Sequence, residues 1–114
     1  MHRMLEGAGY AVSSTVGNLN NDIGVPLSLL RLEQQHDVGL FEVAMNQPGE
    51  IARLGKLVAP QVATVINARG AHRGAFPDDE AIADEKCALW GTAKNTVVGI
   101  LDDPRVAQRL RQQT

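Results

Sequence analysis

The sequence predicts an α/β fold, in which helices flank a mostly parallel sheet in three layers. Three observations favour this class. Four short apolar stretches, rich in β-branched residues, alternate with segments of helical periodicity. Gly, Pro, Asn and Asp bound these stretches, as is typical of turns. The chain has 114 residues, of which 44% are apolar and 21% charged, which is the composition of one small folded domain.

Strands are expected over residues 10–16, 38–45, 62–68 and 96–101, and helices over 25–35, 50–59, 77–90 and 104–110. In the first half, Gly17 ends a β-prone stretch and opens a polar turn cluster. Pro26 suits the first turn of the Leu-rich helix that follows. The second strand is an apolar run with one carboxylate, Glu42, and its length is typical of a buried strand. An amphipathic helix comes next and ends at Pro60.

The second half repeats this alternation. Residues 62–68 form the clearest strand, because they are apolar, β-branched and few. After a Gly-containing loop, the acidic residues that follow Pro77 lie where a helix dipole favours negative charge. Beyond the last strand, Asp102, Asp103 and Pro104 begin a short helix. Ligands of parallel sheets bind beyond the carboxyl ends of the strands, so we expect a site in the loops that follow the four strands.

Composition excludes several classes of function. The formal net charge is −2 and the pI is about 5.8, so the positive surface of proteins that bind nucleic acid or anionic membranes is missing. No apolar run approaches the roughly 18 residues of a membrane helix, and the first residues predict no secretory signal. The single cysteine, Cys87, forms no intrachain disulfide and no zinc-finger spacing with the three histidines. We therefore expect a cytoplasmic protein without nucleic-acid or membrane partners.

Two residues stand out near the expected ligand edge. Glu42 is a carboxylate in an apolar stretch, where burial is costly unless the group is paired, protonated or bound to a metal. The alternative is an outward-facing position on an edge strand, and periodicity favours neither reading. His72 lies in the loop after the clearest strand. It is either an exposed loop residue, which is the commoner case, or a contact to a metal or phosphate.

Other polar residues admit an ordinary and a functional interpretation. Lys86 lies in the middle of a predicted helix, where lysines, like the neighbouring Asp84 and Glu85, are usually solvated. Three asparagines within residues 18–21 could simply form turns or cap a helix, although three are more than a turn requires. The sequence contains no GxxxxGK[ST], GxSxG or HExxH signature. The residues by themselves thus predict an α/β domain with an acidic, His-containing ligand edge, and no particular reaction.

Four blocks resemble motifs of the Mur ligase family. Residues 17–26, GNLNNDIGVP, are similar to the GNxNNxIGxP motif, and residues 42–51 to the ExGAxxxGEI block. Residues 67–76 resemble the TNxxxAHLExF block, and residues 102–104 the NxDDP segment. Their order and spacing agree over nearly the whole chain. The first block favours the D-alanyl-D-alanine-adding branch over other amide ligases of the superfamily, such as relatives of folylpolyglutamate or cyanophycin synthetases.

This resemblance implies an ATP- and Mg²⁺-dependent amide ligase of peptidoglycan precursor synthesis. Such a ligase joins D-alanyl-D-alanine to UDP-N-acetylmuramoyl-tripeptide through an acyl phosphate. The resemblance also implies roles for six residues. They are the metal ligands Glu42 and His72, the catalytic Lys86, which is carbamylated in the family and lies fourteen residues after His72, and the substrate- or phosphate-binding Asn20, Asn21 and Asn67. A metal would explain the carboxylate in the apolar stretch, because Mg²⁺ prefers oxygen ligands.

The family's phosphate-binding loop, GxxGK[ST], lies upstream of the segment that Met1 to Tyr10 matches, and this sequence does not contain it. We therefore expect residues 1–114 to be a partial middle domain, without the UDP-binding N-terminal domain, the phosphate loop and the C-terminal domain. Two functions stay open. The chain is either a portion of a ligase that is inactive alone, or an inactive remnant or stand-alone binding module. Because an uncovered apolar sheet edge invites pairing, we also expect self-association.

Overall fold

The computed structural model describes residues 1–69 and 74–113. The chain divides into two compact units, Met1–Ala44 and Met45–Thr114. Both contain parallel strands with flanking helices, so the predicted α/β class is confirmed. The strands form two parallel pairs instead of one hydrogen-bonded sheet. Each pair joins strands of the same unit.

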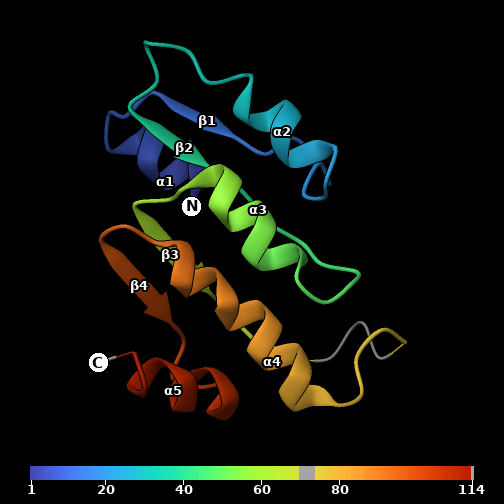
Figure 1. The fold of residues 1–114 in the computed structure, drawn as a ribbon. Helices are drawn as coiled ribbons and strands as arrows, with labels where there is room; N and C mark the ends of the chain where they lie inside the picture. The colour runs from blue at the N-terminus through green and yellow to red at the C-terminus, as the bar shows by residue number, and fades with distance from the viewer. Residues whose placement is uncertain (70–73, 114) are drawn as a thin grey trace. The chain divides into compact units, whose positions relative to one another are not determined.

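The first unit contains α1 (His2–Gly7), β1 (Val12–Ser14), α2 (Gly24–Leu29) and β2 (Val38–Leu40) (Figure 1). The two strands are parallel, with Val12 opposite Val38 and Ser14 opposite Leu40. The Leu-rich helix was expected to reach residue 35 but ends at Leu29. Leucines beyond this point are exposed, Leu30 to 81%, and a helix gains most of its stability from burying an apolar face.

The second strand of this unit corrects the prediction for residues 38–45. It ends at Leu40, so Glu42 lies beyond the strand. Glu42 is exposed and therefore is not a buried carboxylate within a strand. Its surroundings impose no desolvation cost, and the burial argument for a metal at this residue does not apply.

The second unit contains α3 (Glu50–Val58), β3 (Val62–Val65), α4 (Asp79–Cys87), the 3₁₀ helix η1 (Ala88–Thr92), β4 (Thr96–Gly99) and α5 (Pro104–Arg111) (Figure 1). The helix predicted over 77–90 begins two residues later and ends in the tighter turn of η1. That turn places Trp90 in the core, where its indole Nε1 donates to the carbonyl oxygen of Val98 at 3.2 Å. Among the described residues, no helix is long and apolar enough to cross a membrane.

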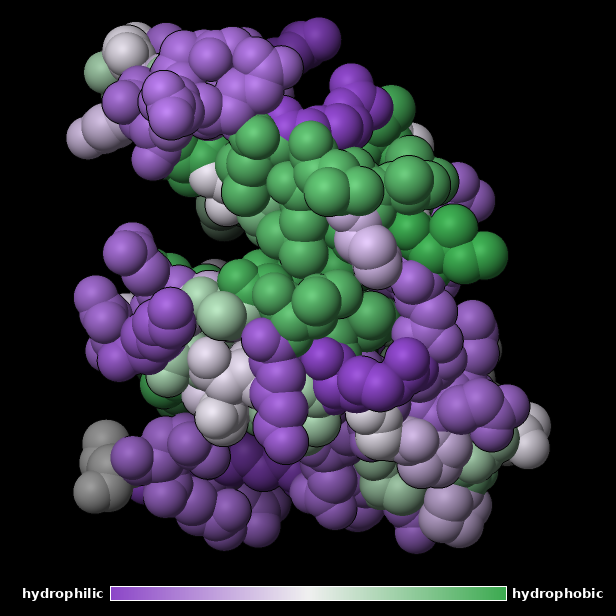
Figure 2. All heavy atoms as spheres, turned by 45° about the horizontal axis from the view of Figure 1, so that its top comes forward, coloured by the Kyte–Doolittle hydropathy of each residue, from purple (hydrophilic) through white to green (hydrophobic). Residues whose placement is uncertain are grey.

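One face of the β3–β4 pair forms the core of this unit, and the other face is exposed. The buried cluster joins strand and helix residues: Ala63, Val65, Ala68, Ala83, Cys87, Trp90 and Val106. On the opposite face of the strands, Val62 is 54% exposed and Val98 is 42% exposed. Figure 2 shows that hydrophobic residues reach the surface of the molecule over a broad area. Exposed and buried residues therefore alternate along β3, because only one face of the strand packs against the core.

We predict that Ile82→Ala lowers the free energy of unfolding by about 2–5 kcal/mol, because the side chain is fully buried and its loss leaves a cavity. Urea unfolding followed by the fluorescence of Trp90, the single tryptophan, measures this change. Leu57→Ala is the control. It removes a side chain that is 53% exposed, and it should shift stability by no more than about 0.5 kcal/mol. Equal losses in the two variants would contradict the assigned core.

Candidate functional site

The loops at the carboxyl ends of β1 and β2 are tied together by hydrogen bonds. Beyond the ladder, the Thr15 N–H donates to the carbonyl oxygen of Leu40 at 3.0 Å. The Glu42 N–H in turn donates to Thr15 Oγ1 at 2.9 Å. Asn20 Nδ2 donates to Glu42 Oε1 at 3.1 Å, and the Asn20 carbonyl accepts from the Ala44 N–H at 2.8 Å. Two predicted site residues, Asn20 and Glu42, therefore meet at this edge.

Asn21 has a structural role at the start of α2. Its Oδ1 accepts from the N–H groups of Ile23 at 3.2 Å and Gly24 at 2.8 Å, which supplies acceptors for the first amides of the helix. A Cβ at Gly24 would lie 2.3 Å from the Leu19 backbone, so the turn requires glycine there. The Asn-x-x-Gly spacing of this block is thus explained by a tight turn, and phosphate or metal binding by Asn21 stays a prediction.

A second cluster follows the carboxyl end of β3. Lys86 Nζ donates to Asn67 Oδ1 at 3.4 Å and to the carbonyl oxygen of Arg69 at 3.3 Å. Lys86 is half-buried, although a helical lysine is usually solvated. The structure therefore brings together two residues that were predicted separately, Asn67 and Lys86. Both acceptors of Nζ suit an ammonium group.

Asp103 links this cluster to α5. Its side chain is 7% exposed, and Oδ2 accepts from the buried Ala68 N–H at 2.8 Å. Oδ1 accepts from the N–H groups of Arg105 at 3.0 Å and Val106 at 3.4 Å, which caps the helix. The hydrogen bond from Ala68 is the largest cause that holds the pKa of the Asp103 carboxyl below its ordinary 3.8, and burial opposes it. The sequence indicated that a helix begins here, but not the bond to Ala68.

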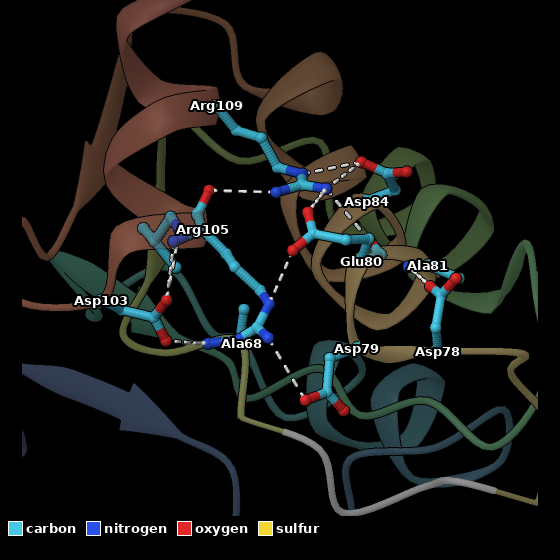
Figure 3. A network of polar contacts seen from close by, with 10 residues as sticks. Ala68, Asp78, Asp79, Glu80, Ala81, Asp84, Asp103, Arg105 and Arg109 are labelled. Atoms are coloured by element: carbon cyan, nitrogen blue, oxygen red, sulfur yellow. Dashed lines mark hydrogen bonds and ion pairs between the residues drawn. The ribbon is translucent and has the colours of Figure 1, made fainter.

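A network of ion pairs joins α5 to α4 (Figure 3). Arg105 contacts Glu80 at 2.8 Å and Asp79 at 3.4 Å. Arg109 contacts Glu80 at 2.9 Å and Asp84 at 2.7 Å. The hydrogen bond from Arg109 is the largest cause that lowers the pKa of Glu80. Asp84 was expected to be a solvated surface residue. It is exposed as predicted, but it also belongs to this network.

Glu85 is not the solvated residue that was expected. Its carboxylate accepts from the N–H groups of Gly49 at 2.9 Å and Ile51 at 3.0 Å, at the start of α3. Gly49 has a φ of 87°, in the left-handed region that favours glycine. Glu85 therefore anchors α3 from the neighbouring helix. The sequence carries no signal for this contact, because its partners are backbone groups 34 and 36 residues away.

The remaining candidates carry less. His72 lies outside the described residues. No group of three or more His, Cys, Asp or Glu side chains poised to hold a metal occurs in the described part of the chain. Burial raises the pKa of the Cys87 thiol to about 11, so it stays protonated near neutral pH. An open pocket of about 470 Å³ lies at the start of α4, with Phe76, Asp79 and Arg105 in its lining.

Known proteins resemble this chain in sequence and in structure. The model of the Mur ligase middle domain matches residues 1–114. UDP-N-acetylmuramoyl-tripeptide–D-alanyl-D-alanine ligase of Treponema pallidum is 37% identical over 103 residues, which cover 90% of this chain and 22% of that protein. The ligase of the same name from Bacillus subtilis is 31% identical over 116 residues, which cover 100% of this chain and 25% of that protein.

Solved structures agree with these matches. A crystal structure of MurF from Acinetobacter baumannii superposes with a TM-score of 0.86 at 32% identity, covering 92% of this chain and 23% of that one. MurF ligase from Thermotoga maritima, solved in complex with ADP, gives a TM-score of 0.86 at 30% identity, covering 97% of this chain and 26% of that one. The chain thus spans about a quarter of the length of its relatives.

We predict that acid destabilises the fold through Asp103. A carboxyl whose pKa is lowered in the folded state contributes stability above its ordinary pKa, and this contribution is lost as the pH falls through the lowered value. The difference in unfolding free energy between wild type and Asp103→Asn should therefore be larger at about pH 6 than at about pH 2.5. Urea unfolding at both pH values measures it, with the exposed Asp102→Asn as matched control. A difference independent of pH would contradict the argument.

Proposed function

This chain belongs to the Mur ligase family through its middle domain, and from this premise we propose that it is part of a D-alanyl-D-alanine-adding ligase. The observation that carries the proposal is the 37% identity to the D-alanyl-D-alanine-adding ligase of Treponema pallidum over 90% of this chain, within the match of all 114 residues to the middle domain. Within that segment, Asn20 with Glu42 and Asn67 with Lys86 are the two site pairs. In this proposal they serve the transfer of a phosphoryl group and the formation of an amide.

The proposed reaction has two steps. The carboxylate of UDP-N-acetylmuramoyl-tripeptide attacks the γ-phosphorus of ATP, the bond to the β-phosphate oxygen breaks, and an acyl phosphate and ADP form. The amine of D-alanyl-D-alanine then attacks the acyl carbon, inorganic phosphate leaves, and the amine loses a proton. The ADP bound to the Thermotoga maritima relative supports a nucleotide substrate. Catalysis of this kind depends on positioning and on neutralising the charge of the transferred phosphoryl group.

Glu42 suits the binding of Mg²⁺. Its carboxylate is exposed beyond the end of β2, and its Oε1 is oriented by Asn20 Nδ2. Magnesium binds through one or two carboxylates and retains several waters, so a solvent-facing oxygen fits it better than a closed cage does. When bound, the ion supplies positive charge beside the transferred phosphoryl group. His72 is proposed as a second metal ligand only because of the resemblance to the family.

Lys86 is the residue proposed to react with CO₂. Its ammonium first loses a proton to solvent. The neutral Nζ then attacks the carbon of CO₂, an N–C bond forms, and a second proton leaves, which gives a carbamate anion. The present partners of Nζ, Asn67 Oδ1 and the Arg69 carbonyl, are both acceptors and suit the ammonium. A carbamate needs donors, and Asn67 can supply them by turning its amide.

We predict that the chain alone releases no phosphate from ATP in the presence of both other substrates. The 114 residues contain no GxxGK[ST], so the backbone amides and the lysine that cradle the β- and γ-phosphates are missing. A coupled phosphate assay checks this. Turnover at ~1 s⁻¹ or faster, an ordinary enzyme rate, would contradict it.

An exchange of segments tests the proposed activity. Placed in the Treponema pallidum ligase instead of the matching segment, this chain should restore phosphate release that requires ATP, muramoyl-tripeptide and D-alanyl-D-alanine together. Glu42→Gln and Lys86→Met should each lower kcat roughly 100-fold or more, because the first removes the proposed ligand of the Mg²⁺ that neutralises the phosphoryl charge and the second removes the proposed carbamate. Phosphate release and amide product are measured together.

Matched controls make this exchange interpretable. Glu33→Gln and Lys94→Met change exposed residues of the same types and should leave kcat unchanged. A hybrid with the thermal stability of its parent but no activity would favour the alternative, an inactive remnant or binding module. Full activity in both site variants would contradict the residue roles.

A further inference from the structure

We propose that Asp103 is a positioning residue for Lys86, acting through the backbone between Asn67 and Arg69. The inference rests on the proposed function only for its catalytic meaning. The effect of Asp103 on the position of the Lys86 amine can be measured without ligase activity.

Asp103 binds Ala68, the residue that lies between the two partners of Lys86 in the chain. Nζ of Lys86 donates to the side chain of Asn67 and to the backbone carbonyl of Arg69. The residue between them, Ala68, is fully buried, and its N–H donates to Asp103 Oδ2 at 2.8 Å. This bond holds the peptide unit between Asn67 and Ala68, and Arg69 follows directly. The backbone that carries both acceptors of Lys86 is therefore anchored at Ala68 by the Asp103 carboxylate.

The same carboxylate fixes α5, and α5 in turn fixes the helix of Lys86. Oδ1 of Asp103 caps α5, from which Arg105 and Arg109 reach the acidic residues of α4. Figure 3 shows these contacts of Asp103, Arg105 and Arg109. Lys86 lies on α4, so its amine is located from two sides by contacts that both lead back to Asp103. Hydrogen bonds to a carboxylate are stronger than those between neutral groups, so Asp103 holds Ala68 and the start of α5 more strongly than a neutral side chain would. A lowered pKa keeps the Asp103 carboxyl ionised near neutral pH.

The variant Asp103→Asn separates the two functions of the carboxylate. Its amide oxygen can still cap α5, but its Nδ2 then faces the Ala68 N–H, and two donors do not pair. Asp103→Ser is a second variant that keeps a hydroxyl cap and is too short to replace the bond to Ala68. Asp78→Asn is the matched control, because Asp78 caps α4 by accepting from the Ala81 N–H.

The experiment compares the reactivity of the three lysines of the chain, Lys56, Lys86 and Lys94, towards trace amounts of an acylating reagent. Mass spectrometry of peptides gives each rate, and Lys56 and Lys94 are references in every sample. We expect the rate at Lys86 to rise threefold or more in Asp103→Asn or Asp103→Ser. Hydrogen exchange at the Ala68 amide should accelerate in the same variants, while the amides of Arg105 and Val106 stay protected. Asp78→Asn should change none of these.

Faster exchange at Ala68 with an unchanged rate at Lys86, in either variant that retains its near-UV circular dichroism, overturns the proposal. Within the hybrid ligase, Asp103→Asn should lower kcat and leave the KM for ATP unchanged. If Lys86 responds to Asp103 in the labelling assay but Lys86→Met leaves kcat unchanged, the positioning role stands and the proposed function fails. The two failures are therefore distinguishable.

Discussion

The buried carboxylate of Asp103 is the contact on which the second unit depends. One of its oxygens holds the chain as it leaves β3, and the other starts α5. A buried N–H without an acceptor is costly, so the Ala68 amide requires this partner as much as α5 requires its cap. Through α5, the arginines then orient α4. Short-range capping and long-range tertiary order therefore share one side chain, and the position of Lys86 follows from both.

Each of the two units holds one pair of the residues proposed for the site. Parallel strands end at the same edge, and the loops beyond them meet there. In the first unit this rule brings Asn20 to Glu42. In the second unit only Asn67 follows a strand, and α4 carries Lys86 to it. Each pair joins an amide to an ionisable group. An amide can donate or accept, so it can serve a charge of either sign.

That property is relevant to the chemistry proposed for Lys86. The ammonium of an unmodified lysine carries positive charge and needs acceptors, whereas a carbamate carries negative charge and needs donors. The carbonyl of Arg69 can serve only the first state, while the exposed amide of Asn67 can serve both. In the proposed reaction, the lysine has to stay in place through this change of charge. Asp103 meets this need because it anchors the backbone beside Lys86 and does not itself contact the amine.

The sequence by itself determined the α/β class and the order of the main strands and helices, because these depend on local periodicity and turn chemistry. Its motifs also identified the family, and they predicted as site residues Asn20, Glu42, Asn67 and Lys86. The tertiary structure decided where the elements end, as at Leu40, because an element continues only while packing supports it. It alone decided the roles of Glu85 and Asp103. Glu85 and Asp103 each bind backbone amides more than thirty residues away, and backbone groups are the same in every residue, so no sequence pattern marks these long-range contacts.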